Sequence, residues 1–517
     1  MALISLLPKL AVAVVALLVT RRVYWELTTG ARRRAFAKQH GCLAAKKEPG
    51  NPFGFGLDIL MADIKAIKNH NLLPRWHKIL LDAGDAHMVY FSFRGKKIFF
   101  TDSPEILKTV LATKFDTYSI GEERIKMLTP LVGKGIFTTD GAPWKHSRGL
   151  LRPCFERSQV ADVTLLEKHV RKLIEVIPKD GSTIDMQPIF HDLTMDIATE
   201  FLFGRSTNML EREGKDPEAE EFKAAFEYCM NPFEGELYTK WGWLAIFLPD
   251  KQLKRSAKII QAFAGKIIDA EIAFRGDKAP PSPDRYILLQ ELLSLDMPRE
   301  QVRSELLQIL LAGRDTTASL LSNLLFELPR HPAILSRLRA EIAEYVGDST
   351  PTFEQLKNMK YLQAVMNESQ RLYPVVPSNS REAIEDTVIP LGGGPDAKAP
   401  VFVPKGSMIA WHTWSLHRRE DIYGADSASF NPSRWLDNEN PDGPLRPGWG
   451  YLPFNGGPRV CIGQQFALTE VAYVLVRLLQ GVGEVESRDP EEWREKLTFV
   501  CRGLGGCKVS FTEKGSA

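Results

Sequence analysis

A single cysteine stands in a glycine-rich loop near the carboxyl end of the chain, in the stretch FNGGPRVCIGQQFALTE from Phe454 to Glu470. Apolar residues recur at helical spacing after Gly463, so a helix is expected to begin directly after Cys461. A helix N-terminus and the neighbouring Arg459 both favour thiolate over thiol. Two interpretations of Cys461 are open: a small apolar residue at a helix start, or a thiolate that holds a metal.

A second group of reactive residues interrupts the apolar segment LLQILLAGRDTTASLLSNLLFEL, Leu306 to Leu328. A segment that is apolar on all sides predicts a buried helix. Its middle nevertheless contains Gly313, Asp315 and Thr316, which are poor helix formers or need partners when buried. One interpretation is a groove in which Gly313 leaves space for a ligand, Thr316 offers a hydroxyl and Asp315 relays protons. The other is a packing notch or kink, with the threonine bonded to the preceding turn.

A third pattern consists of charged residues that can lock a loop. Glu368 and Arg371 are three residues apart near the end of a helix expected over 353–372, so they share one face. Arg434 lies downstream in FNPSRW, amid aromatic residues and prolines. A partly buried carboxylate between two arginines would fix that loop through bidentate bonds. Taken singly, each motif is also typical of an ordinary surface ion pair.

The elements that must position these residues are mainly helical. Apolar residues recur at helical spacing near 160–180, 220–230, 255–275, 300–328, 333–346, 353–372 and 464–480. Short strands are expected at Met88–Phe93, Lys97–Asp102, Val401–Pro404 and in a pair near the carboxyl terminus. The predicted fold class is mainly α with a small β region. A chain of 517 residues can bury a large core, and its six cysteines without CxxC pairs argue against structural zinc or a secreted disulfide scaffold.

The N-terminus is basic and apolar. Residues 1–47 carry nine Lys or Arg against one acid, so they contribute +8 to a total of +2 and leave −6 for the remainder, which argues against a nucleic-acid partner. The apolar run Ile4–Thr20 approaches the roughly 20 residues that span a bilayer, and the stronger basic cluster follows it. We therefore predict a transmembrane signal-anchor over 1–20, with a short interfacial helix as the alternative because of Pro8 and Lys9. Residues 21–56 are predicted as a basic juxtamembrane segment and hinge, and 57–517 as the catalytic domain.

The spacing Phe454-x-x-Gly457-x-Arg459-x-Cys461-x-Gly463 resembles the haem-loop signature of the cytochrome P450 monooxygenases. Ala312-Gly313-x-Asp315-Thr316, Glu368-x-x-Arg371 and Arg434 in its F-x-P-x-R-W context resemble the other motifs of that family, in the family's order. The resemblance covers essentially the whole chain. It implies the cytochrome P450 fold and a catalytic domain that binds haem b, with Cys461 as the axial iron ligand.

The same resemblance implies roles for the other residues. Trp144 and Arg148, in DGAPWKHSRGLLRP, resemble the pair that contacts a haem propionate, and Arg381 and Arg459 resemble further propionate partners. Thr316 would deliver protons together with Asp315. The remaining matched positions, which would shape the haem site or form a structural ion-pair scaffold, are Ala312, Gly313, Phe454, Gly457, Gly463, Glu368, Arg371 and Arg434.

The implied reaction is O2-dependent monooxygenation, in which one oxygen atom enters a C–H bond and the other leaves as water. NADPH electrons would arrive through a separate NADPH–cytochrome P450 reductase, with cytochrome b5 as a further donor, since no dinucleotide-binding GxGxxG follows a strand. A single-pass anchor would place the protein at the endoplasmic reticulum membrane with its catalytic domain in the cytosol.

For the substrate, GIFTTDGAPWKHSR, AGRDTTA, HRREDIYG and QQFALTE resemble the fungal branch that hydroxylates fatty acids and n-alkanes at the terminal (omega) carbon. The pocket segments implied by analogy are largely apolar, as a long chain requires: 120–128, 307–313, 375–378 and 499–504. Arg124, Lys126 and Arg502 are interpreted as solvated cations, with contact to a substrate carboxylate as the alternative. The competing functions are oxidation of another lipophile, such as a secondary-metabolite intermediate or xenobiotic, and haem binding without turnover.

Overall fold

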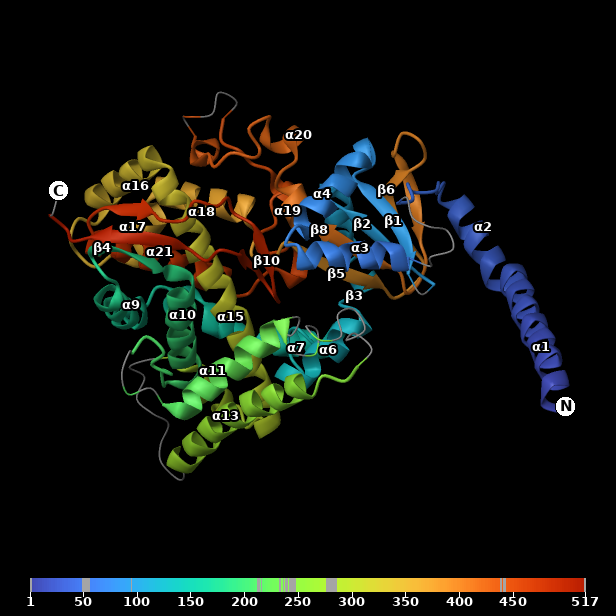
Figure 1. Cartoon of the computed structure of the whole chain (residues 1–517), viewed down its shortest axis with the longest axis horizontal. Coiled ribbons are helices and arrows are strands. Elements are labelled where there is room, and N and C mark those ends of the chain that lie inside the picture. The colour runs from blue at the N-terminus through green and yellow to red at the C-terminus, as the bar shows by residue number, and fades with distance from the viewer. Residues whose placement is uncertain are drawn as a thin grey trace.

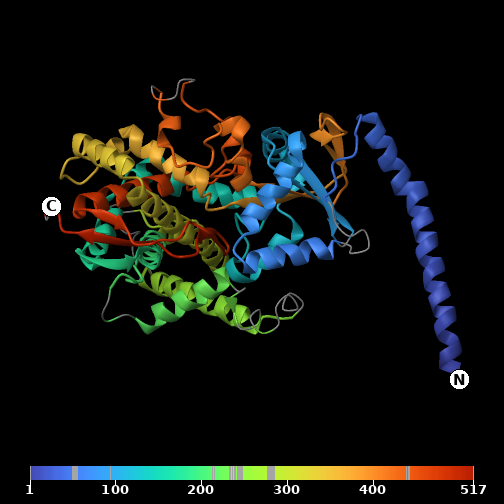
Figure 2. The ribbon, with the colours of Figure 1, turned by 45° about the horizontal axis from the view of Figure 1, so that its top comes forward.

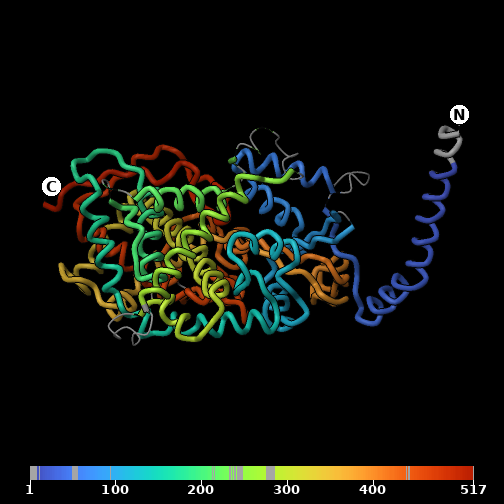
Figure 3. The backbone as a smooth tube through the Cα atoms, turned by 90° about the horizontal axis from the view of Figure 1, so that it is seen from below, coloured from blue at the N-terminus to red at the C-terminus, as the bar shows by residue number. Residues whose placement is uncertain are grey.

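The computed structural model describes residues 2–48, 56–93, 95–211, 214, 216–231, 234–235, 237, 240, 248–275, 286–437, 439 and 443–515. Most of the chain forms one body, with helices on one side and a β-rich region on the other (Figure 1). The helix α1 (Ala2–Trp25) projects away from this body, and the N- and C-termini lie at opposite ends of the molecule (Figures 1, 2 and 3).

The helical side is organised around α15 (Arg299–Glu327), a helix of 29 residues that crosses the middle of the body. It packs against α10 (Met186–Phe203), α13 (Lys251–Arg275), α18 (Lys360–Leu372) and α21 (Gln464–Gly481). Further helices are α3 (Leu57–Lys68), α4 (Leu72–Asp82), α5 (Pro104–Lys108), α6 (Glu122–Val132), α7 (Gly141–Leu151), α8 (Arg157–Val160), α9 (Thr164–Val176), α11 (Pro217–Met230), α14 (Leu288–Ser294), α16 (Pro332–Tyr345), α17 (Phe353–Asn358), α19 (Thr413–Leu416) and α20 (Glu420–Tyr423).

The β side contains a five-stranded sheet in the order β1-β2-β8-β5-β3. Strand β2 runs parallel to β8, whereas the other neighbours are antiparallel. Three smaller pairings, β6–β7, β10–β11 and β4–β12–β9, complete the β structure of the described residues. The strands are β1 (Met88–Phe93), β2 (Lys96–Thr101), β3 (Tyr118–Ser119), β4 (Asp180–Asp185), β5 (Ser378–Ala383), β6 (Thr387–Gly393), β7 (Ala399–Val403), β8 (Met408–His412), β9 (Val485–Ser487), β10 (Glu495–Leu497), β11 (Cys501–Gly503) and β12 (Lys508–Thr512).

The predicted mainly α class with a small β region is confirmed, and most helix bounds lie within a few residues of the expected ones. One helix differs, because the segment expected over 353–372 is divided at Met359, whose extended backbone separates α17 from α18. The capping box at Thr352 and Gln355 is present at the start of α17. Helix α10 was not predicted; most of its residues are buried, so it lacks the one-sided apolar pattern that identifies a surface helix.

The transmembrane span predicted over residues 1–20 is not found: no helix in the described ranges is long and apolar enough to cross a membrane. Lys9 and Arg21 bound the uninterrupted apolar run Leu10–Thr20, which at eleven residues is short of the roughly 20 required.

The basic segment that follows α1 is joined to the body. After a π-helical turn at Glu26–Gly30 the chain continues as α2 (Ala31–Gln39). In α2, Arg33 forms an ion pair with Asp386 at 2.8 Å, and the ring of Phe36 lies 5.7 Å from that of Phe402. Residues 49–55 of the predicted hinge lie outside the described residues.

Candidate active site

The cysteine loop is closed by its own backbone and leads into α21. The 3₁₀ turn Gly457–Arg459 precedes Cys461, whose N–H donates to the carbonyl of Phe454 at 3.0 Å. Helix α21 begins at Gln464, so Cys461 stands just before a helix N-terminus, as predicted. The fold therefore holds the thiol in a short, internally bonded loop.

The thiol of Cys461 lies deep in the protein and yet faces open space. The surface of Cys461 is exposed. The protein atoms around it nevertheless remove enough water to raise the pKa of its thiol. A backbone bond at Gly463 and the charge of Arg148 act in the opposite direction. A cavity of about 470 Å³ accounts for the exposure; it is lined by Arg148, Arg152, Phe155, Glu156, Cys461 and Ile462. This volume is in the range of small-molecule and cofactor sites.

The glycines of the loop are required by protein packing. Gly457 has φ +69°, and a Cβ there would lie 1.9 Å from the carbonyl oxygen of Leu111. A Cβ on Gly456 would lie 2.6 Å from the ring of Trp449. A side chain at either position would displace the loop, because real Cβ atoms do not approach so closely. These glycines fix the loop against the body.

Arg459 binds a carboxylate and a backbone carbonyl, whereas its position near Cys461 in the sequence had suggested an effect on the thiol. Its Nη2 donates to Asp140 Oδ1 at 2.6 Å and to the Thr139 carbonyl at 2.9 Å, and its guanidinium lies 4.3 Å from the centre of the Trp144 ring. Arg148, not Arg459, is the cation that lowers the pKa of Cys461, and its Nη1 bonds to the carbonyl before the cysteine at 3.0 Å. The prediction that Arg459 acts on the thiol is wrong.

Three arginines and one aspartate form a cluster beside the cysteine loop, which we call the guanidinium cluster: Arg124, Arg381, Arg459 and Asp140. Burial and the charges of Arg124 and Arg459 lower the pKa of Arg381 to about 9. Burial also lowers the pKa of Arg459 to about 10, with Asp140 opposing that shift and Arg124 adding to it. Three cations against one anion leave a formal surplus of two positive charges in a largely buried region, which is costly without a counter-charge.

Arg381 also has side-chain donors without a hydrogen-bond acceptor among the described residues. Its Nη1 donates to the Ser380 carbonyl at 2.7 Å and to Asn379 Oδ1 at 3.4 Å, and among the described residues no partner is found for its Nε and Nη2. A guanidinium presents its donors as a fork that matches a carboxylate. The cluster therefore fits a buried group that carries two carboxylates, as haem does.

Helix α15 exposes one narrow face in its middle. Between Ser304 and Leu328 every residue is buried except Ala312, Gly313 and Thr316. These three positions lie on one side of a helix. A Cβ on Gly313 would meet no atom within 4 Å, so open space adjoins the backbone there. Both earlier interpretations of this segment apply: it offers a groove, and the Thr316 hydroxyl donates to the Ala312 carbonyl at 2.7 Å.

The acid next to this face is paired. Asp315 is buried, and its Oδ1 accepts from Arg314 Nη1 at 3.0 Å. The other terminal nitrogen of Arg314 donates to Glu227 on α11 at 3.0 Å. His191 on α10 places its Nε2 3.8 Å from the same Asp315 oxygen. The aspartate therefore belongs to a charged network that reaches α10 and α11.

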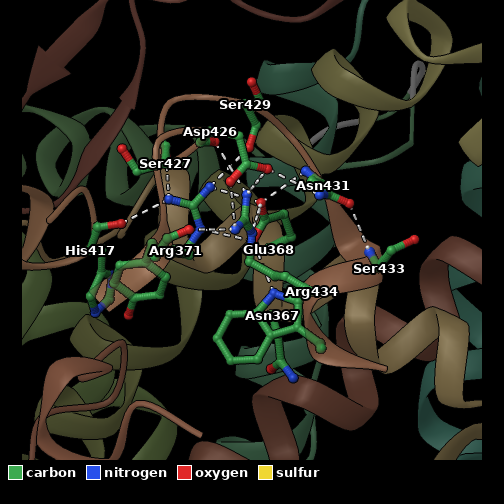
Figure 4. A network of polar contacts seen from close by, with 12 residues as sticks. Asn367, Glu368, Arg371, His417, Asp426, Ser427, Ser429, Asn431, Ser433 and Arg434 are labelled. Atoms are coloured by element: carbon green, nitrogen blue, oxygen red, sulfur yellow. Dashed lines mark hydrogen bonds and ion pairs between the residues drawn. The ribbon is translucent and has the colours of Figure 1, made fainter. Parts of the chain in front are cut away.

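Glu368, Arg371 and Arg434 come together in the core (Figure 4). Glu368 and Arg371 are fully buried, with two N–H···O bonds of 2.8 Å between them, and Arg434 Nε donates to Glu368 at 3.0 Å. The same carboxylate accepts from the Asn431 backbone and the Trp435 indole, both at 2.9 Å. The bidentate bonds lie within α18, between Glu368 and Arg371, and single bonds from Asn431, Arg434 and Trp435 join the carboxylate to the FNPSRW loop.

Of the four expected pocket segments, 307–313 is part of α15, and the other three are joined to one another or to α15 by the contacts below. The backbone N–H of Cys501 donates to the Val375 carbonyl at 2.8 Å, and Arg124 Nη1 donates to Asn379 Oδ1 at 3.0 Å. Helix α15 itself contacts both α6 and β11. Val376 and Phe499 each leave 37% of their surface exposed. Segments far apart in sequence are therefore brought together near α15.

Of the three cations that were expected to be solvated, Lys126 is exposed and the two arginines are not. Lys126 is exposed and pairs with Glu122, as predicted. Arg124 belongs to the guanidinium cluster instead, and Arg502 is partly buried with its Nη1 3.5 Å from His191 Nε2. Asp140, which precedes α7 as its N-cap residue, was also missed; the pattern Asp-Gly-Ala-Pro before a helix is the signal that could have identified it.

These features define a class of protein: a mainly helical body with a deep cysteine, a cluster of arginines with an excess of positive charge, and a buried helix with one open face. The chain belongs to the cytochrome P450 family, whose model matches residues 82–492. It is 39% identical to cytochrome P450 monooxygenase himC of Aspergillus japonicus over 503 residues, covering 96% of this chain and 88% of the relative. With cytochrome P450 52E1 of Candida apicola it shares 40% identity over 477 residues, 89% and 90% of the two chains.

The fold is that of the family as well. The crystal structure of the cytochrome P450DA heme domain superposes with a TM-score of 0.74 at 20% identity, covering 92% of this chain and 98% of that one. The protein is therefore a cytochrome P450 monooxygenase, which uses haem with cysteine thiolate ligation, O2 and NADPH-derived electrons. The resemblance seen in the sequence is confirmed at the level of the family.

Proposed function

We propose that Cys461 is the axial ligand of the haem and that the guanidinium cluster, with Trp144 and Arg148, holds its two propionates. The excess of buried positive charge in the cluster is the observation that carries this assignment, because two carboxylates would supply the missing counter-charge. A thiol that faces a cavity supports it further. Coordination to a metal ion deprotonates a thiol even where burial raises its pKa. The bound haem supplies the activation of O2 for insertion into a C–H bond.

Asp315 and Thr316 are proposed to deliver protons within the site. Thr316 lies on the open face of α15, whereas Asp315 is buried beside it and connected to the half-exposed Glu227 through Arg314. An acid and an alcohol that are adjacent in sequence, one facing a charged network and the other an open space, can pass protons from solvent to the site. Such a pair has no role in a haem-binding protein without turnover.

The proposed reaction is hydroxylation of fatty acids or n-alkanes at the terminal carbon. The resemblance of AGRDTTA and QQFALTE to that fungal branch supports it, as do the partly exposed apolar side chains of Val376 and Phe499 in the expected pocket segments. A long, unbranched chain gains about 0.8 kcal/mol per buried CH2 in such surroundings. The relatives that carry the number 52 are consistent with this branch.

The second candidate is oxidation of another lipophile, such as a secondary-metabolite intermediate. It is favoured by relatives that carry other names: himC covers 96% of this chain at 39% identity, and FPY7 of Fusarium mangiferae covers 98% at 36%. Both candidates share the same residues around the haem and differ only in the apolar pocket.

Electrons are proposed to come from a separate NADPH–cytochrome P450 reductase at the endoplasmic reticulum membrane, with cytochrome b5 as a further donor. The N-terminal helix supports membrane association, because it leaves apolar side chains such as Leu10, Val12 and Leu17 largely exposed and is followed by a basic segment. Flotation with liposomes of endoplasmic reticulum lipids tests this point. A chain that lacks residues 2–30 is expected to stay at the bottom of the gradient.

The substrate is tested by titrating the haem-loaded enzyme with fatty acids and alkanes of increasing length and by turnover with reductase and NADPH. A spin-state shift and a terminal hydroxy acid are expected; neither would appear if another lipophile is the substrate. Thr316→Ala is expected to consume NADPH with less product. Thr317→Ala is the matched control, because Thr317 is buried and does not lie on the open face of α15.

A further inference from the structure

A buried arginine joins the proton-delivery pair to a neighbouring helix. Only 1% of the Arg314 side chain is exposed, and its two terminal nitrogens bond to different carboxylates: Nη1 to Asp315 and Nη2 to Glu227, each at 3.0 Å. Its guanidinium also lies 5.3 Å from the centre of the Phe226 ring. Phe226 and Glu227 are on α11, whereas Arg314 and Asp315 are on α15. One guanidinium therefore forms a charged bridge between the two helices.

Asp315 and Thr316 do not contact each other in this arrangement. Asp315 faces Arg314, while the Thr316 hydroxyl donates to the Ala312 carbonyl within its own helix. Among the hydrogen bonds of the described residues none joins the acid to the alcohol. The bond to Arg314 therefore fixes Asp315 Oδ1 on a different side from the Thr316 hydroxyl.

Arg314 is the cation that holds the aspartate. The other basic group at Asp315 is His191, whose Nδ1–H donates to the Gln187 carbonyl at 2.8 Å, so that its Nε2 faces Asp315. Burial lowers the pKa of His191 to about 4, and Arg314 and Arg502 act in the same direction, so the imidazole is neutral at pH 7. A neutral ring that has its proton on Nδ1 cannot donate to the carboxylate.

We propose that Arg314 is a positioning residue that holds Asp315 away from Thr316, and that Glu227 sets the strength of this hold through the position of α11. The inference rests on the proposed role of Asp315 and Thr316 in proton delivery. The carboxylates of Glu227 and Asp315 compete for the Arg314 guanidinium. A movement of α11 that strengthens the Glu227–Arg314 bond weakens the hold on Asp315. A movement that breaks the Glu227–Arg314 bond leaves Asp315 as the one carboxylate bound to Arg314. The Asp315 carboxylate takes up one proton from the side of the network that Glu227 connects to solvent, and it releases the same proton on the Thr316 side.

The test uses the full-length haem-loaded chain and the variants Glu227→Gln, Arg314→Gln, Arg314→Lys and the double variant Glu227→Gln/Arg314→Gln. Glu221→Gln is the matched control, because Glu221 is an exposed glutamate of the same helix, near Lys266. Three quantities are measured: product formed per NADPH, the solvent isotope effect on turnover, and hydrogen exchange of residues 217–230. Haem absorbance shows whether each variant is folded, and Glu227→Gln, at a half-exposed position, serves if Arg314→Gln does not fold.

Arg314→Gln is expected to change product per NADPH by roughly 2- to 30-fold, the range for network residues that do not touch the ligand, and to alter the isotope effect. Arg314→Lys should reverse only part of this change, because a lysine keeps the positive charge but its ammonium cannot bridge two carboxylates as a guanidinium does. The double variant should match Arg314→Gln, since Glu227 acts through Arg314. Exchange in α11 should become faster in both single variants and stay unchanged in Glu221→Gln.

The inference would be overturned if Arg314→Gln kept the wild-type product per NADPH and the wild-type isotope effect. It would also be overturned if the effects of the two substitutions were additive in the double variant. Unchanged exchange of residues 217–230 in Glu227→Gln would overturn the link to α11, and this readout needs no substrate. An enzyme that binds and oxidises no fatty acid or alkane would contradict only the proposed substrate, since coupling is then measured with whichever lipophile shifts the spin state.

Discussion

The substitution Glu368→Gln replaces a fully buried carboxylate by an amide of the same size. The carboxylate accepts five hydrogen bonds, three at Oε1 and two at Oε2, from Arg371, Arg434, Asn431 and Trp435. The amide keeps one acceptor oxygen, turns an NH2 group toward donors, and leaves Asp426 as the remaining carboxylate that contacts Arg434. Removal of one member of a buried ion pair costs about 3–5 kcal/mol, because the partner charges stay buried.

Thermal unfolding of the haem-loaded chain measures this cost. An unfolding entropy of about 2.1 cal/mol/K per residue gives about 1.1 kcal/mol/K for a chain of this length, so Tm should fall by about 3–5 °C. Haem content should fall as well, since Glu368 ties α18 to the FNPSRW loop (Figure 4). Glu354→Gln is the control: Glu354 pairs with Arg157 at the surface, where both side chains are more than half exposed, and little change in Tm is expected. A Tm for Glu368→Gln equal to that of wild type would refute the reasoning.

Three further predictions concern other parts of the molecule. Burial raises the pKa of Glu470 to about 8, so the folded state keeps a proton that the unfolded state loses near pH 4.5. The free energy of unfolding should therefore fall by up to about 1.4 kcal/mol per pH unit as pH rises from 4.5 to 8. Urea titrations of Glu470→Gln should lack that contribution. Gly457→Ala should lose haem, because its Cβ would meet a backbone carbonyl, whereas Gly149→Ala, with open space around it, should retain haem by absorbance. Arg381→Gln should release haem to apomyoglobin about tenfold faster or more, as expected for a lost charge-assisted hydrogen bond, and the surface variant Arg337→Gln should not.

The features that local sequence determines were predictable. Helix α15 was expected over 300–328 and runs from Arg299 to Glu327, because its apolar residues form one continuous pattern between Pro298 and Pro329. The cysteine loop was also predictable, since its glycines, arginine and cysteine are within a few residues of one another. Each of these depends on residues that are close in the chain.

Features that depend on distant contacts were not predictable. Arg124 looked like a solvated cation, and only the fold places it near Arg381 and Arg459. Strand β8 pairs in parallel with β2 across about 300 residues, which no turn signal indicates. The bond between Glu227 and Arg314 likewise requires that α11 lie near α15. Charged residues carry no periodic pattern that would identify their partners.

The assignment of Cys461 as the haem ligand is tested most directly by the carbon monoxide difference spectrum of the reduced protein. The wild-type chain and Cys507→Ala, in which another cysteine is removed, should both show the Soret band characteristic of thiolate ligation. Cys461→Ala should lose that band, whether or not haem remains bound. A thiolate-type band that persists in Cys461→Ala would contradict the assignment.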